Sequence, residues 1–279
     1  MKLPRRDFLK TSLAASAAAA TLATRTDAAS SSSSSAGVRE FYELRAYKLK
    51  PGPWRAGLDT YLEKAVLPAL DQRGIKNVGV FSEIEVNKPA ATSTPKADTP
   101  LWVFIPYPSL EAFVDVSAEL NNDAAVQKAG GDYLRATKPN PAFDRIDSWL
   151  LRAFKSMTKM EVPAFSKNRT ATRVFEMRDY QSHSELAALN KMAMFDEGET
   201  QIMRDLGMSP MFFGQALVGP DLPHLRYITS GPDLATHLAN WKKFGPDPRW
   251  AKMKDDPKWA NNTSKNTARF LVPTSYSQI

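Results

Sequence analysis

Two short segments of the chain, "YELRAY" and "FEMRDY", carry the same charged and aromatic residues at the same spacing. The shared residues are Glu43, Arg45 and Tyr47 in the first segment and Glu176, Arg178 and Tyr180 in the second. Because successive residues of a strand point to opposite faces, each triplet lies on one face of a strand. A guanidinium and a phenol on one face can hold an anionic or carbonyl ligand, while the carboxylate balances the charge.

The same triplets admit a second interpretation, in which they form a structural salt-bridge network between two sheets. We expect the alternate, more apolar residues of these strands to meet the helices, and the charged set to point into the interior of a barrel. The more apolar set comprises Tyr42, Leu44 and Ala46 in the first strand and Phe175, Met177 and Asp179 in the second. Charges buried in a barrel must be paired and hydrogen-bonded. The sequence leaves open whether this interior is a locked seam or a ligand pocket.

Other catalytic chemistry is sparse in the sequence. There is no Cys, so thiol nucleophiles, thiolate metal ligands and disulfides are excluded. The three histidines form no pair with metal-ligand spacing, and neither a phosphate-binding Gly-rich loop nor a serine nucleophile elbow is present. We therefore predict no metal and no cofactor, His183 in an exposed turn, and His237 on a helix at the edge of the core. His224 and Arg226 are the nearest acid–base candidates, and no catalytic residue is assigned.

The first residues have the pattern of an export signal. The motif residues are Arg5, Arg6, Phe8, Leu9 and Lys10. An Ala-rich segment up to Ala23 follows, which is typical of a twin-arginine signal and too short and weakly apolar to span a membrane. We expect a signal peptide over 1–28, a flexible Ser-rich segment over 29–37, no stable membrane anchor after cleavage, and a periplasmic or secreted location.

The charge of the chain points away from nucleic acid. The net charge is +7, and the predicted signal holds five basic and two acidic residues of that balance. The remaining basic residues are scattered, and no recognisable nucleic-acid module is present. The partners we expect are a small-molecule ligand and a second copy of the chain in a homo-oligomer.

An internal repeat organises the rest of the sequence. The two Glu-x-Arg-x-Tyr triplets are 133 positions apart, and Gly74 matches Gly207 at the same spacing. Further along, Pro108 matches Pro232 and Asp123 matches Asp247 at a spacing of 124. The change in spacing falls in a Pro- and Thr-rich loop of the first copy, as expected for a duplicated unit.

Each copy has the order strand, helix, strand, strand, helix, strand, which is ferredoxin-like and places both helices on one sheet face. Two sheets that pack against each other bury their other faces. We therefore predict an α+β fold of two tandem ferredoxin-like repeats that form a dimeric-type α/β barrel, closed either within one chain or between two. The predicted boundaries are 38–157 for the first repeat, 158–169 for a linker and 170–279 for the second repeat.

Three segments resemble the NIPSNAP family of the dimeric α/β-barrel superfamily. They are "YELRAYKLKPG", the Pro-Leu-Trp strand at Pro100–Trp102, and "W-x-x-F-x-x-DPRW" from Trp241 to Trp250. The resemblance covers Val38 to Tyr276, although each copy keeps only part of the pattern: the first lacks "DPRW" and the second lacks "LKPG". Some relatives in the superfamily bind haem through a helical histidine, a role that the resemblance would give to His237, but we predict packing there instead.

These observations predict an exported NIPSNAP-like barrel protein with a small-molecule-binding or assembly role. The alternative is an enzyme of the monooxygenase or isomerase type that needs little or no cofactor and uses the barrel cavity. In that case a Tyr or His facing the cavity would transfer a proton.

Overall fold

The computed structural model describes residues 38–50 and 54–279. The signal peptide predicted over 1–28 and the Ser-rich segment predicted over 29–37 lie outside the described residues. The described part belongs to one compact unit. Within it, no helix combines the length and apolar character needed to cross a membrane.

The first copy contains the predicted strands and helices together with one additional strand. In chain order its elements are β1 (Phe41–Leu49), α1 (Trp54–Tyr61), η1 (Leu62–Val66), α2 (Leu67–Gln72), β2 (Gly79–Asn87), β3 (Thr92–Pro95), β4 (Leu101–Tyr107), α3 (Leu110–Glu119), η2 (Leu120–Asn122), α4 (Ala124–Ala129), α5 (Gly131–Leu134) and β5 (Phe143–Ala153). The additional strand β3 lies in the Pro- and Thr-rich loop and pairs with the end of β2. After α2 the chain turns at Gly74, whose φ of 74° suits a residue without a Cβ.

The second copy repeats this order after the short helix α6 (Ala164–Lys167), which lies in the predicted linker. Its elements are β6 (Val174–Gln181), α7 (Glu185–Met194), η3 (Phe195–Glu199), α8 (Thr200–Asp205), β7 (Phe212–Val218), β8 (His224–Gly231), α9 (Leu234–Phe244), α10 (Pro248–Lys254), η4 (Pro257–Trp259) and β9 (Lys265–Pro273). The matched residues Asp123 and Asp247 cap α4 and α10, each accepting hydrogen bonds from backbone N–H groups of the first turn.

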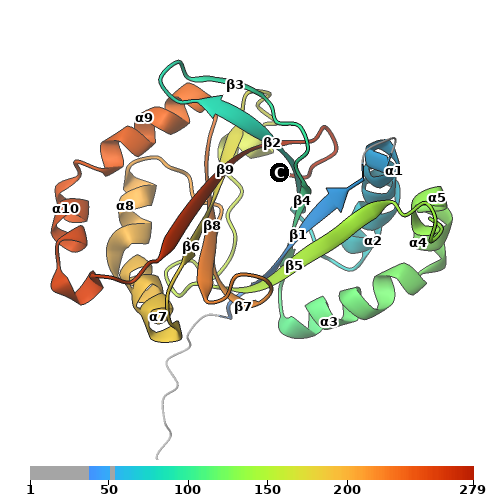
Figure 1. Cartoon of the computed structure of the whole chain (residues 1–279), viewed down its shortest axis with the longest axis horizontal. Helices are drawn as coiled ribbons and strands as arrows, with labels where there is room; N and C mark the ends of the chain where they lie inside the picture. The colour runs from blue at the N-terminus through green and yellow to red at the C-terminus, as the bar shows by residue number, and fades with distance from the viewer. Residues whose placement is uncertain (1–37, 51–53) are drawn as a thin grey trace, which may run out of the picture. The chain divides into compact units, whose positions relative to one another are not determined.

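The strands close into one barrel within the chain. Their order in the described part is β3-β2-β4-β1-β5-β7-β8-β6-β9, and β2 also pairs with β9, so every strand except β3 belongs to a closed ring. The two copies join through the antiparallel pairs β5–β7 and β2–β9. Figure 1 shows the helices of the first copy on one side of the strands and those of the second copy on the other. This answers the question that the sequence left open, because one chain supplies the whole barrel.

The repeat extends to an irregularity in the helices. A π-helical turn interrupts the first long helix of each copy, at η1 and at η3, and these turns are 133 positions apart, like the strand motifs. The cross-strand register is also preserved, since Ala46 pairs with Trp102 where Asp179 pairs with Arg226 in the second copy. Positions that differ between the copies can therefore be compared directly.

Both faces of the sheet are buried. One apolar cluster lies between the strands and helices of the first copy and another lies between those of the second. A third cluster fills the barrel with side chains from strands of both copies, among them Tyr42, Phe104, Phe175 and Phe212. A barrel of eight strands is just wide enough for side chains to fill it or for one small ligand, and this cluster fills the part of the interior that it occupies.

The predicted orientation of the repeated strands is wrong. Tyr42, Leu44 and Ala46 belong to the cluster inside the barrel, whereas Tyr47 belongs to the cluster under the helices of the first copy. The second copy agrees, since Met177 lies inside the barrel and Tyr180 lies under the helices. We expected the more apolar face of each strand to meet the helices. It lies inside the barrel instead, because apolar side chains from both copies fill the barrel interior.

Candidate functional site

The charged residues of β1 form a hydrogen-bonded cluster on the side of the sheet that the helices cover. Arg45 donates to both carboxylate oxygens of Glu43, with Nε–Oε1 and Nη2–Oε2 distances of 2.6 and 2.8 Å. Ser148 Oγ donates to Glu43 Oε1 at 2.9 Å, and Tyr107 Oη donates to Oε2 at 3.0 Å. Each carboxylate oxygen of Glu43 thus accepts two hydrogen bonds. Glu43 is only 4% exposed, and a buried carboxylate must have such partners in place of water.

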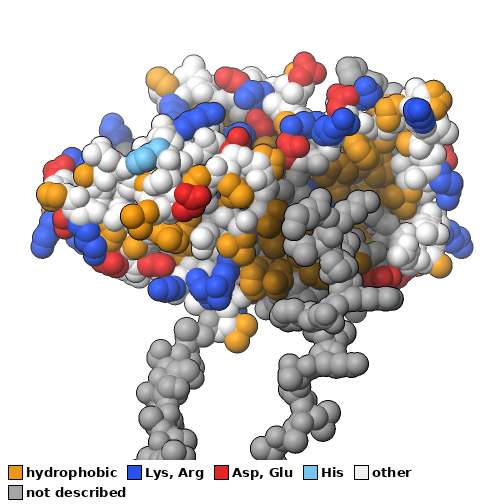
Figure 2. Space-filling model, turned by 60° about the horizontal axis from the view of Figure 1, so that its bottom comes forward, with side chains coloured by type: hydrophobic (Ala, Val, Ile, Leu, Met, Phe, Trp, Pro, Cys, Tyr) orange, Lys and Arg blue, Asp and Glu red, His pale blue; other side chains and the backbone are white. Residues whose placement is uncertain are grey.

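This cluster lines a cavity of ≈ 540 Å³ between β1, β5 and the helices. Its wall includes all three residues predicted from the first triplet, together with side chains from α1, η2 and α5. The additional polar residues in the wall are Tyr61, Asn121, Tyr133, Thr137 and Lys138. The apolar part of the wall includes Leu134, Phe143 and Ile146. Figure 2 shows hydrophobic side chains lining a hollow in the half of the molecule that carries the first copy.

One hydroxyl in this wall has no partner among the described residues. Tyr61 and Tyr133 stack with ring centroids 4.8 Å apart, and Tyr61 Oη donates to Asn121 Oδ1 at 2.7 Å. The Tyr133 hydroxyl is buried without a hydrogen-bond partner. Burial raises the pKa of both phenols, so each keeps its proton at neutral pH. The wall of the cavity therefore contains a buried donor without a partner.

The second copy builds the equivalent position differently. Glu176 binds Arg178 at 3.3 Å, and its Oε2 lies 2.8 Å from His237 Nε2. Trp241 Nε1 contacts the same His237 nitrogen at 3.1 Å, and the Trp241 ring lies 4.3 Å from the Arg178 guanidinium. These side chains occupy the space above Arg178, and a smaller hollow of ≈ 390 Å³ remains beside them. At the repeat spacing of 124, the residue of the first copy that corresponds to Trp241 is Ser117.

The histidines have three different surroundings. His183 is exposed between β6 and α7, as predicted. His237 is fully buried rather than at the edge of the core, because its ring is held by Glu176 and Trp241. His224 is buried at one end of the barrel, on the same face of β8 as Arg226. Residues 38–50 and 54–279 contain no group of three or more His, Asp or Glu side chains suited to hold a metal ion.

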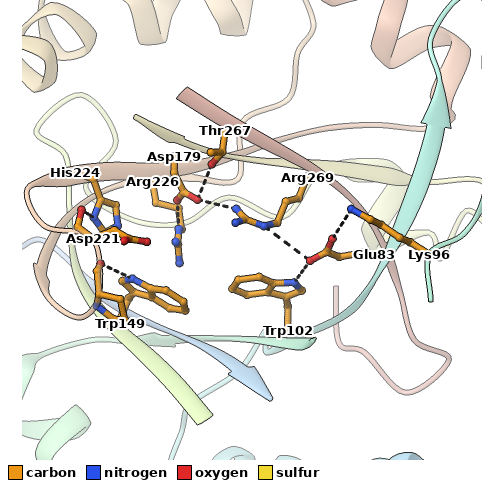
Figure 3. Close-up of polar contacts among 11 residues, drawn as sticks. Glu83, Lys96, Trp102, Trp149, Asp179, Asp221, His224, Arg226, Thr267 and Arg269 are labelled. Atoms are coloured by element: carbon orange, nitrogen blue, oxygen red, sulfur yellow. Dashed lines mark hydrogen bonds and ion pairs between the residues drawn. The ribbon is translucent and has the colours of Figure 1, made fainter. Parts of the chain in front are cut away.

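A second polar group crosses the interior near one end of the barrel, and we call it the interior polar layer. Its members are Glu83, Trp102, Trp149, Asp179, Arg226 and Arg269 (Figure 3). Asp179 forms ion pairs with Arg226 and with Arg269, the latter at 2.8 Å. Glu83 accepts from Trp102 Nε1 at 2.9 Å and lies 3.9 Å from Arg269 Nε. Burial alone would raise the pKa of Asp179, but the two arginines hold it below its ordinary value.

Some residues of both sites were recognisable in the sequence. The triplet of β1 lines a cavity, but this cavity lies under the helices and not inside the barrel, where the ligand site was predicted. Tyr61 and Tyr133 were missed because they read as members of apolar helix faces, and only the fold brings them to β1. For the interior polar layer, the sequence offered one signal: the first copy has Trp102 at the position where the second copy has Arg226.

Two ferredoxin-like copies closed into one ring of antiparallel strands, with a cavity between sheet and helices, define a protein of the dimeric α/β-barrel class. Residues 175–278 match the NIPSNAP family model, so the second copy carries a NIPSNAP domain. Residues 2–23 match the model for a twin-arginine translocation signal, which includes the predicted motif. The chain is therefore exported to the periplasm or secreted.

Two solved structures share this fold at low sequence identity. A candidate monooxygenase from Lactobacillus acidophilus NCFM is 7% identical over 84% of this chain and 94% of its own, with a TM-score of 0.54. A candidate monooxygenase from Fusobacterium nucleatum is 10% identical over 85% of this chain and 93% of its own, with a TM-score of 0.51. A NIPSNAP-like domain protein from Burkholderia xenovorans is 16% identical over 38% of this chain and 89% of its own, with a TM-score of 0.34. No curated protein compared with this chain is similar to it.

Proposed function

We propose that this exported barrel protein binds a small molecule in the cavity of its first copy. The observation that carries the proposal is the buried, unpartnered hydroxyl of Tyr133, a residue in the wall of the cavity that Arg45 also lines. A buried donor without a partner is costly, and a ligand acceptor would remove that cost. The cavity volume of ≈ 540 Å³ lies within the range typical of small-molecule sites.

The wall indicates the chemistry of the ligand. The stacked rings of Tyr61 and Tyr133, with Phe143 and Ile146 beyond them, favour a flat apolar or aromatic body. Arg45 and Tyr133 supply donors at one side, so the ligand should carry an acceptor oxygen, such as a carbonyl. Arg45 is already neutralised by Glu43, which favours a neutral acceptor over a fully charged one.

The enzyme alternative has less support in this cavity. The described wall contains no histidine, and Glu43 already accepts four hydrogen bonds. The pKa values of the Tyr61 and Tyr133 phenols in the wall are raised, so these groups keep their protons and are poor bases at neutral pH. The similarity to candidate monooxygenases, at 7% and 10% identity, supports the fold and not this activity.

Binding can be tested directly on the mature protein. Native mass spectrometry of protein exported by its host should detect a co-purifying small molecule, and 2-acetylnaphthalene provides a neutral aromatic carbonyl probe for calorimetry. We expect Tyr133→Phe to weaken probe binding by about tenfold, the value of one good hydrogen bond. Tyr180→Phe is the matched control, because that hydroxyl bonds to Tyr227 away from the cavity. Equal binding by wild type and Tyr133→Phe would contradict the proposal.

An assembly role is the second candidate, and one observation favours it. Apolar side chains are exposed on α7 and around the β7–β8 turn, and Figure 2 shows hydrophobic side chains on this face. They are Leu186, Leu189, Leu217, Val218 and Leu222. The expected partner is a second copy of the chain, since such a patch is typical of protein interfaces. Sedimentation should then detect a dimer that Leu189→Asp dissociates; a wild-type monomer at all concentrations would exclude it.

A further inference from the structure

The interior polar layer contains a buried donor that the described part of the chain leaves unsatisfied. Arg226 is 3% exposed and its Nε binds Asp179, but its Nη1 has no hydrogen-bond partner among the described residues. His224 is similar: its Nδ1 contacts the carbonyl of Asp221, and its Nε2 is buried without a described partner. Native proteins rarely leave such groups unpaired, so these atoms indicate a missing ligand or water.

Two indole rings lie against the guanidinium groups of this layer. The Arg226 guanidinium carbon is 4.1 Å from the ring centroid of Trp149, and that of Arg269 is 5.4 Å from the ring centroid of Trp102. The two indoles are 5.8 Å apart and nearly parallel. A guanidinium stacked on an aromatic face keeps its N–H groups in its own plane, where a planar carboxylate can accept two of them. Figure 3 shows Arg226 extending from beside Asp179 toward Trp149, and the Arg269 guanidinium lying between Asp179 and Glu83 above Trp102.

Neither carboxylate of the layer accepts a hydrogen bond from Arg226 Nη1. Asp179 is engaged by Arg226 Nε, by Arg269 and by Thr267, whose hydroxyl lies at 3.2 Å. Glu83 is held by Trp102 and lies 3.6 Å from Lys96. Both carboxylates therefore have cationic or N–H partners of their own, which lessens their repulsion of a further anion.

The interior polar layer lies close to solvent, because the next positions on the same face of β1 and β5 are exposed or partly exposed. Along β1, Ala46 is buried beside Trp102, whereas Lys48, the next residue on the same face, is exposed. The next interior residue of β5 after Trp149 is Asp147, which is also partly exposed. Ala46 has only a methyl group at the position where the second copy has Asp179, so the first copy offers the smaller side chain. Lys48 and Lys96 at this end pair with Asp147 and Glu83.

We propose that this end of the barrel interior is a second ligand site, which binds a small planar carboxylate through Arg226 Nη1, beside Trp102 and Trp149. The site is separate from the helix-covered cavity and does not depend on the function proposed for it. Copy one contributes the two tryptophans and copy two the two arginines at equivalent positions of the repeat, so the site exists only in the fused barrel.

Calorimetry with benzoate on the full mature protein tests this proposal. We expect benzoate to bind and the neutral isostere benzamide to bind at least tenfold more weakly. Arg226→Met should weaken benzoate binding by about tenfold or more, the value of a hydrogen bond to a charged group. Arg204→Met removes an arginine from a surface pair with Glu161 and should leave benzoate binding unchanged. Unchanged binding in Arg226→Met, or loss of binding in Arg204→Met, would overturn the proposal.

A structure of the wild-type protein with benzoate provides a test that needs no folded variant. A benzoate carboxylate within hydrogen-bonding distance of Arg226 Nη1 is the expected result. Benzoate found only in the helix-covered cavity, or a water molecule alone on Nη1 at saturating benzoate, would show that the layer is purely structural and would overturn the inference.

Discussion

Tyr133 stacks on Tyr61 with ring centroids 4.8 Å apart, yet only the hydroxyl of Tyr61 has a hydrogen-bond partner in the described structure. The two residues belong to α5 and α1, and both line the cavity that Arg45 lines. In a purely structural cluster both hydroxyls should be satisfied. Their difference is the main reason for regarding the cavity as a binding site.

Removing each hydroxyl in turn should have opposite effects on stability. Tyr133→Phe deletes a buried group without a partner, so the free energy of unfolding should stay the same or rise by up to about 1 kcal/mol. Tyr61→Phe deletes the bond to Asn121 and should lower it by about 1 kcal/mol. Urea denaturation of the ligand-free variants measures both. A clear loss of stability in Tyr133→Phe would mean that its hydroxyl has a partner in the protein.

The Glu43–Arg45 pair should behave as a coupled buried unit. Replacing Glu43 by Gln leaves a mostly buried guanidinium without its counter-charge, and we expect the free energy of unfolding to fall by about 3 kcal/mol. The double change Glu43→Leu with Arg45→Met removes both charges and should cost less than Glu43→Gln alone. A double variant less stable than the single one would show that the pair stabilises the fold by itself.

Copying one residue from the second copy into the first should close the cavity. Ser117 is exposed on α3, at the position where Trp241 covers Arg178 on α9. We expect Ser117→Trp to reduce 2-acetylnaphthalene binding by tenfold or more with little change in melting temperature, because an exposed position tolerates substitution. Ser117→Ala is the matched control and should bind normally. Normal binding by Ser117→Trp would argue that the ligand does not reach Arg45.

Acid should weaken the fold through Asp179. Its pKa in the folded protein lies below the ordinary value, so its stabilising contribution is present above the unfolded pKa of about 3.9 and is lost as the pH falls below it. Wild type should therefore lose more stability between pH 5 and pH 3 than Asp179→Asn, which starts lower. Asp144→Asn, which removes only an exposed pair with Lys50, should follow wild type. Parallel pH profiles of wild type and Asp179→Asn would contradict this role.

The sequence predicted the architecture because duplication leaves a direct record. The matched triplets, glycines and helix-capping aspartates gave the order and spacing of the elements, and the fold bears them out. The face of β1 was predicted wrongly because alternation identifies two sets of residues without saying which set is inside. In a barrel covered by helices both faces are buried, so the apolar character of Tyr42 and Leu44 does not decide the question.

The cavity itself could be predicted only in part. Arg45 and Tyr47 were recognisable because they repeat, whereas Tyr61 and Tyr133 have no equivalent in the other copy that would mark them. Their positions depend on how α1 and α5 pack over β1, which is set by tertiary contacts. The ion pairing of Arg226 with Asp179 likewise depends on cross-strand register, which sequence alone does not provide.

Ligand binding in the first copy is tested most directly by a crystal structure of the mature protein after export, refined with attention to the cavity beneath α1, η2 and α5. We expect electron density for a flat molecule against Tyr61 and Tyr133, with an acceptor oxygen within hydrogen-bonding distance of the Tyr133 hydroxyl and of Arg45. A cavity that holds only water, in protein that also fails to bind 2-acetylnaphthalene, would contradict this expectation.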